Sequence, residues 1–110
     1  MAHPYFEEEV MEEALEKRWR KAQLYGPQDV RLDMVTGRFW VQSQATDELL
    51  GYNGNVWFRA MKLSRAVCGC ADFHKKFEDK KDEPLLHGVR VCKHVLAAGR
   101  WWKVLKEQEG

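Results

Sequence analysis

The sequence predicts a small α+β domain with an N-terminal helix, a small antiparallel sheet (a β-hairpin or three strands) and a C-terminal helix. Apolar residues recur at helical spacing near both ends of the 110-residue chain, and runs rich in aromatic and β-branched residues lie between them. All three cysteines fall in one region with a histidine, just before the second helical stretch. A chain of this length suits one domain. We therefore expect a helical segment over residues 1–27 and a single compact unit over residues 28–110.

The first helix is predicted over residues 4–24. Its apolar stripe consists of Phe6, Val10, Met11, Ala14, Leu15, Trp19 and Ala22. Pro4 suits the first turn, and Gly26-Pro27 ends the helix. Glutamates gather near its start and basic residues near its end, which complements the helix macrodipole. The charges therefore fit a solvated helix, and the alternative is an acidic face that binds a partner.

Two extended segments follow, over residues 38–44 and 56–62. Both are rich in aromatic and β-branched residues, and a polar connection that contains Gly51 and Gly54 separates them, which favours an antiparallel pair. Residues 29–34 form a possible earlier strand, and residues 65–67 lead toward Cys68. On the second segment, alternation places Trp57 on the opposite face from Val56 and Phe58, so one aromatic face of so small a domain stays uncovered.

The second helix is predicted to begin next to Cys92. Its apolar stripe is Val95, Leu96, Ala98, Trp101, Trp102 and Leu105. Consecutive helix positions lie about 100° apart, so we expect one residue of the Trp101-Trp102 pair to be exposed. The segment over residues 75–84 is dense in mixed charge and is predicted to be a loop.

Composition limits the class of protein. The formal net charge is +1 and the pI is near 7.7, below the value of about 9 that is typical of nucleic-acid-binding domains. The charge is uneven, because residues 1–16 carry six glutamates and no lysine or arginine, which leaves the rest of the chain basic. No apolar run approaches the roughly 20 residues of a membrane span, and the acidic start does not resemble a secretory signal. We expect a soluble intracellular protein, in the cytoplasm, nucleoid or nucleus, with no membrane partner.

The cysteines and one histidine form a metal-ligand pattern. Cys68 and Cys70 are separated by 21 residues from Cys92, which is followed two positions later by His94. Three thiolates and one imidazole suit a single tetrahedral Zn²⁺ with no open coordination position, which predicts a structural ion. An odd number of cysteines also argues against a disulfide framework.

The local geometry of the pattern sets further expectations. Residues i and i+2 of a straight strand point to opposite faces, so the chain must bend near Gly69 for both cysteines to reach one ion. Cys92 should lie just before a helix, with His94 in its first turn. Several alternatives remain open: His74 or His87 as a replacement ligand, a catalytic zinc with Asp72 as a base, and cysteines that are merely buried.

The pattern resembles the SWIM-type zinc finger, in which Cys-x-Cys and Cys-x-His follow two strands and run into a helix. Residues 68–73 are similar to the first knuckle of that family, and residues 92–98 to its second knuckle and opening helix. The resemblance covers roughly residues 29–105. Gly69 stands where the family often has serine or threonine, Ala71 where proline is frequent, and the spacer is long. The resemblance implies a zinc-binding module that contacts DNA or another protein.

Two hypotheses of function follow, both non-catalytic. The first is an accessory nucleic-acid-binding factor whose candidate contact residues are Arg59, Lys62, Arg65, Lys93, Arg100 and Lys103. The second is a protein-interaction adaptor that uses the N-terminal helix and exposed aromatic residues. An enzyme is not expected, because every cysteine is assigned to the metal and Ser43 and Ser64 lie in no nucleophile motif. No small-molecule substrate is expected.

Overall fold

The computed structural model describes residues 13–42, 51–78 and 83–109. Its elements are α1 (Glu13–Ala22), β1 (Val30–Leu32), β2 (Arg38–Gln42), β3 (Gly51–Arg59), β4 (Lys62–Cys68), α2 (Ala71–His74), β5 (Leu85–Leu86), β6 (Val89–Arg90) and α3 (Lys93–Glu109). The predicted α+β class is confirmed. The predicted helix over residues 4–24 lies partly outside the described residues, as do the last two residues of the predicted 38–44 strand.

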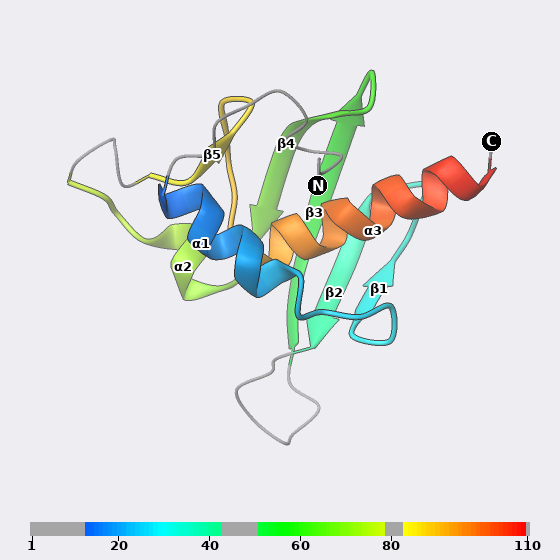
Figure 1. Ribbon diagram of the computed structural model, residues 1–110, viewed down its shortest axis with the longest axis horizontal. Coiled ribbons are helices and arrows are strands. Elements are labelled where there is room, and N and C mark those ends of the chain that lie inside the picture. Colours follow the sequence, from blue (N-terminus) through cyan, green and yellow to red (C-terminus); the bar gives the residue numbers. More distant parts are fainter. Residues whose placement is uncertain (1–12, 43–50, 79–82, 110) are drawn as a thin grey trace.

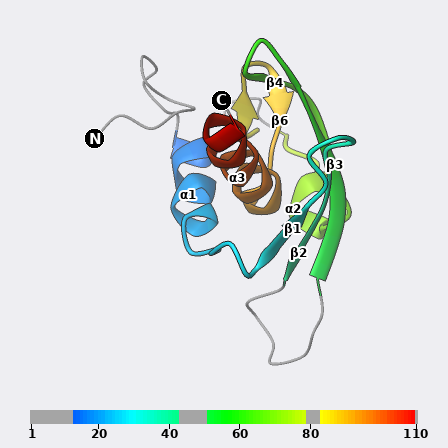
Figure 2. The same cartoon turned by 90° about the vertical axis from the view of Figure 1, so that its right-hand side faces the viewer.

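Strands β1 to β4 form one antiparallel sheet in the order β1-β2-β3-β4. Helix α3 crosses one face of this sheet and contacts all four strands, and α1 packs on α3 (Figures 1 and 2). The short β5–β6 hairpin lies beside β4. We call the face of the sheet away from α3 the outer face.

The core lies between the sheet and α3. Val41 and Val56 are buried from the sheet side, and Leu15 and Trp19 from α1. The buried residues of α3 are His94, Val95, Leu96, Ala97, Ala98, Gly99 and Lys103. A run of small and apolar residues at the start of α3 allows the helix to lie close to the strands.

Both residues of the Trp101-Trp102 pair are half-buried, and each has a packing partner. The indole Nε1 of Trp101 donates to the backbone oxygen of Tyr25 at 3.1 Å. Trp102 stacks on Phe58, with ring centroids 4.0 Å apart and planes 4° from parallel. The expectation of one exposed tryptophan here is therefore wrong, because each ring has its own partner on a different side of α3.

The position of the sheet's second hairpin differs from the prediction. The segment 56–62 contains the end of β3, a two-residue turn and the start of β4, and β3 begins as early as Gly51. Gly51 and Gly54 lie inside this strand because aromatic rings of β2 occupy the space of a side chain. A Cβ atom would lie 2.3 Å from the Trp40 ring at Gly51 and 2.3 Å from the Phe39 ring at Gly54.

The β3–β4 turn carries backbone strain. Ala60 and Met61 have φ angles of 52° and 64°, as the central residues of a type I′ turn require. Residues with a Cβ atom disfavour this region by about 1–2 kcal/mol. The pairing of β3 with β4 thus imposes the turn. Ala60 and Met61 by themselves disfavour the positive φ angles that the turn requires.

Replacing the turn with Ala60→Asn and Met61→Gly should raise the free energy of unfolding by about 1 kcal/mol, since Asn-Gly accepts positive φ at both positions. Chemical denaturation measures the change. Ala60→Ser is the matched control, because serine retains the unfavourable Cβ. Equal stability of the double variant and the wild type would contradict this interpretation.

Candidate metal centre

The four predicted ligands come together from three elements. Cys68 ends β4, Cys70 directly precedes α2, and Cys92 and His94 flank the first residue of α3. All four residues are buried, and their ligand atoms lie within 4.8 Å of one another. The residues Cys68, Cys70, Cys92 and His94 can therefore hold one metal ion, and we call them the metal centre.

The distances within the cluster fit a tetrahedral ion. Nδ1 of His94 lies 3.8 Å from Sγ of Cys68 and 3.9 Å from Sγ of Cys92. Metal–sulfur bonds of about 2.3 Å and metal–nitrogen bonds of about 2.0 Å in a tetrahedron separate a nitrogen from a sulfur by roughly 3.5 Å and two sulfurs by roughly 3.8 Å. The observed separations leave room for one such ion. Nδ1 is thus the nitrogen that faces it.

Two of the cysteines occupy the N-cap position of a helix. The backbone N–H of Phe73 donates to Sγ of Cys70 at 3.4 Å, and that of Val95 donates to Sγ of Cys92 at 3.5 Å. These bonds satisfy N–H groups that the first turn of each helix leaves unpaired. They also favour the thiolate form, as does the positive end of a helix. The arrangement expected for Cys92 and His94 is confirmed.

Aromatic rings hold the imidazole of His94. The ring of Tyr52 lies at 4.6 Å between centroids with a tilt of 31°, and the ring of Tyr25 approaches edge-on at 5.8 Å. Among the described residues, nothing accepts a hydrogen bond from the buried Nε2. Packing therefore orients this ligand where many metal sites use a carboxylate or carbonyl. Burial, with the nearby Cys92 thiol, raises the pKa of Tyr25 to about 12, so its phenol stays neutral.

The thiols share protons in the absence of an ion. Hydrogen bonds from Cys68 and then Cys92 lower the pKa of Cys70 far below its ordinary value. The hydrogen bond with Cys70 raises the pKa of Cys68 to about 12, and hydrogen bonds with Cys68 and Cys70 raise the pKa of Cys92. A divalent ion must therefore displace the protons of Cys68 and Cys92, whose pKa values are raised, to gain thiolate ligands from them.

The alternative histidine ligands and the role of Gly69 can be judged from their positions. His74 and His87 are exposed and do not belong to the cluster. Gly69 has no left-handed φ, and an added Cβ would meet only the backbone oxygen of Asn53, at 3.6 Å. The bend between the two cysteines therefore does not depend on glycine. A serine at this position, as in the resembling family, fits the space.

The candidate nucleic-acid residues do not form a single surface. Arg59, Lys62 and Arg65 are exposed on the β3–β4 hairpin, whereas Lys93 lies at the start of α3. Arg100 is half-buried with its guanidinium 5.1 Å from the Trp101 ring centroid. Lys103 is only 9% exposed, which leaves little of it for a ligand.

The outer face of the sheet carries two arginine–tryptophan pairs. Arg31 lies directly across from Trp40, and Arg65 directly across from Trp57. Each guanidinium lies over its ring, at 5.3 Å and 4.8 Å from the centroid. A register shift beside Trp57 leaves Ser64 as an extra residue in β4 and thereby keeps Arg65 opposite the ring.

The charged residues of strands β1 to β4 are all basic. Together β1 to β4 contain five basic residues and no acidic residue. The sequence alone did not indicate Arg31 and Arg38. Only the pairing of their strands shows that these charges lie on the same sheet as the other basic residues. It also missed a basic pocket among α1, α2 and α3, since its residues lie far apart in the chain.

No protein-family model matches the chain, and no curated protein or solved structure matches it either. Among the helices of the described residues, none has the length and apolar character needed to cross a membrane.

We expect Cys92→Ser to abolish stoichiometric metal binding and to unfold the domain. A thiolate ligand is lost where metal binding and folding are coupled, a coupling of about 10–16 kcal/mol in small zinc domains. Elemental analysis and circular dichroism report the two effects. Gly69→Ser and His87→Gln should behave like the wild type, and a folded, metal-loaded Cys92→Ser protein would disprove the assignment.

Metal affinity should rise with pH. The raised pKa values of Cys68 and Cys92 keep both thiols protonated at neutral pH, so binding releases two protons. The apparent association constant should therefore increase by about 100-fold per pH unit near neutrality. Competition with a chelator of known affinity, between about pH 6.5 and 8, measures the slope. A slope near zero would show that the thiols are already ionised.

Proposed function

We propose that the chain is a non-catalytic nucleic-acid-binding module of the SWIM type, built around one structural Zn²⁺. The observation that carries the proposal is the outer face, where exposed arginines and two tryptophans lie on a sheet without acidic residues. Zinc is favoured because three thiolates and an imidazole, all buried, match its structural sites. The order of the ligands, after strands and before a helix, supports the SWIM assignment.

The outer face has the chemistry that single-stranded nucleic acid requires. Trp57 is 37% exposed, and its cross-strand partner Arg65 adds a positive charge at the ring. Bases stack on aromatic rings with about 1–3 kcal/mol each, and arginines contact phosphates or stack on bases. Arg31 and Trp40 repeat the same arrangement two strands away. Two separate stacking positions on one sheet suit the bases of a flexible strand better than the stacked bases of a duplex.

The low net charge does not oppose this function. Six of the 17 acidic residues lie within residues 1–16, and none lies in strands β1 to β4. Local potential at the sheet, rather than the charge of the whole chain, acts on an approaching phosphate, because charges farther than about 10 Å are screened at 0.1 M salt.

A protein-interaction adaptor is the second candidate. An apolar groove of about 420 Å³ lies between β1 and the end of α3. Its lining residues are Pro27, Val30, Leu32, Trp101, Val104, Leu105 and Gln108. Such a groove suits an apolar anchor from a partner. It offers no positive charge, so salt dependence separates the two functions.

Fluorescence anisotropy with single- and double-stranded oligonucleotides tests the proposal. We expect binding to the single strand that weakens between about 50 and 200 mM salt. Trp57→Leu should weaken it about 10-fold, because it removes a stacking ring but keeps an apolar strand residue. Arg65→Gln should weaken binding and reduce the salt dependence.

Arg20→Gln is the matched control, since Arg20 is exposed on α1 and away from the sheet. No binding at low salt, or equal weakening by Arg20→Gln and Arg65→Gln, would reject the outer face and favour the adaptor. Circular dichroism confirms that each variant is folded.

A further inference from the structure

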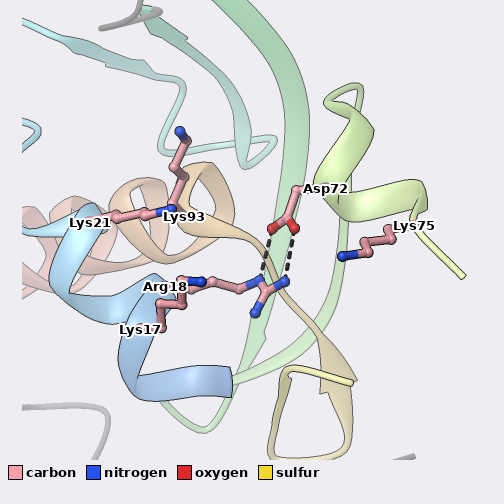
Figure 3. A pocket seen from close by; sticks show the side chains of 6 residues that line it. All are labelled: Lys17, Arg18, Lys21, Asp72, Lys75 and Lys93. Atoms are coloured by element: carbon pink, nitrogen blue, oxygen red, sulfur yellow. Dashed lines mark hydrogen bonds and ion pairs between the residues drawn. The ribbon is translucent and has the colours of Figure 1, made fainter. Parts of the chain in front are cut away.

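The helical side of the domain contains a second concentration of positive charge. Six residues from three helical elements line a cavity of about 230 Å³: Lys17, Arg18, Lys21, Asp72, Lys75 and Lys93 (Figure 3). We call this cavity the basic pocket. Its five basic residues and one acidic residue give it a formal charge of +4. It does not involve the residues of the outer face.

The single carboxylate of the basic pocket is already neutralised. Arg18 binds Asp72 through two parallel hydrogen bonds, from Nε and Nη2 to the two carboxylate oxygens, each 2.8 Å long. Its remaining Nη1 donates to the backbone oxygen of Ala14 at 3.0 Å. All three guanidinium nitrogens of Arg18 thus donate a hydrogen bond, and the pair with Asp72 joins α1 to α2 (Figure 3). The positive charge left for a ligand belongs to the four lysines.

No ion pair fixes those lysines within the described part of the chain, although Glu13 and Glu16 lie beside Lys17 and Lys21. None of Lys17, Lys21, Lys75 and Lys93 forms an ion pair with a described carboxylate. Like charges that share one cavity repel each other and destabilise the folded state. An anion bound among them removes this cost.

The stability of the helices explains the positions of only some of these four lysines. Lys21 belongs to the last turn of α1, where the macrodipole favours a cation, and Lys17 lies near the middle of this helix. Lys93, however, is the first residue of α3, where the macrodipole disfavours a cation. Lys75 follows α2 as its C-cap residue. Three separate elements therefore bring their charges to one cavity.

The size and charge of the basic pocket limit its ligand. Sites for drug-sized molecules occupy about 300–1,000 Å³, so a cavity of about 230 Å³ suits a small ion or group. Ammonium groups from several directions match the oxygens of a tetrahedral oxyanion. We infer that the basic pocket binds a phosphate dianion, either as inorganic phosphate or as the phosphate group of a small phosphomonoester. This inference does not depend on nucleic-acid binding at the sheet.

Calorimetric titration of the zinc-loaded full chain tests the inference, with inorganic phosphate as the first probe at constant ionic strength. We expect saturable binding and a rise in the unfolding temperature with phosphate, because a ligand of the native state stabilises it. Ribose 5-phosphate and ribose, as further probes, distinguish the sources. Binding of ribose 5-phosphate but not ribose assigns the site to phosphomonoesters as well, and binding of inorganic phosphate alone assigns it to the free ion.

Substitutions of lining residues test whether phosphate binds in the basic pocket. Lys17→Gln and Lys93→Gln should each weaken phosphate binding by roughly 5- to 10-fold, since each removes a charged donor. Lys62→Gln is the matched control, because Lys62 is an exposed lysine of β4 that does not line the basic pocket. Asp72→Asn should strengthen binding, because it removes the only carboxylate and frees Arg18, and a misfolded protein does not show such a gain.

No saturable binding at about 20 mM phosphate, a concentration that still detects millimolar affinity, would overturn the inference. Equal weakening by Lys62→Gln and Lys93→Gln would overturn it too, because the anion would then respond to overall charge. Weaker binding by a folded Asp72→Asn protein would likewise exclude this pocket.

Discussion

The closure of the chain by four metal ligands is the constraint on which the rest of the structure depends. The ligands join the end of β4 to the start of α3 across a 21-residue connection. Once Cys92 and His94 are fixed to Cys68 and Cys70, the first turn of α3 lies at the end of the sheet, and the helix extends over all four strands. A domain of this size buries a limited apolar area. A metal ion held by these four residues would supply stability that packing between a short α1, one long helix and a single sheet provides only in part.

Much of the fold could be predicted because it follows local rules. The apolar stripe of α3 and the strand at residues 38–42 appear directly in the sequence. The strand that begins at Gly51 does not, because its Gly and Asn residues are typical of loops until their neighbours are known. Glycine is required there by the rings of Trp40 and Phe39 on the adjacent strand. The β5–β6 hairpin was missed for a related reason, since its turn at His87-Gly88 lies beside a run of mixed charge.

The candidate sites also differ in how far the sequence alone predicts them. All four ligands of the metal centre could be identified from spacing, since soft ligands in two close pairs have few other uses. The arginine–tryptophan pairs needed the register of the sheet, because Arg31 is nine residues from Trp40 and opposes it only after pairing. The basic pocket needed the packing of α1 against the metal-bound segments. Residues 54 positions apart meet in the bond between Arg18 and Asp72.

The two basic surfaces depend on the metal to different degrees. Lys93 lies between two ligands, and Asp72 is two residues from Cys70, so both knuckles contribute to the basic pocket. Loss of an ion bound at the metal centre would release the segments that carry these residues, and α1 would lose its ionic contact with them. The outer face is held instead by backbone pairing within antiparallel hairpins, whose register places Arg65 on Trp57 independently of α3. Partial loss of structure at the metal centre should therefore disturb the basic pocket before it disturbs the outer face.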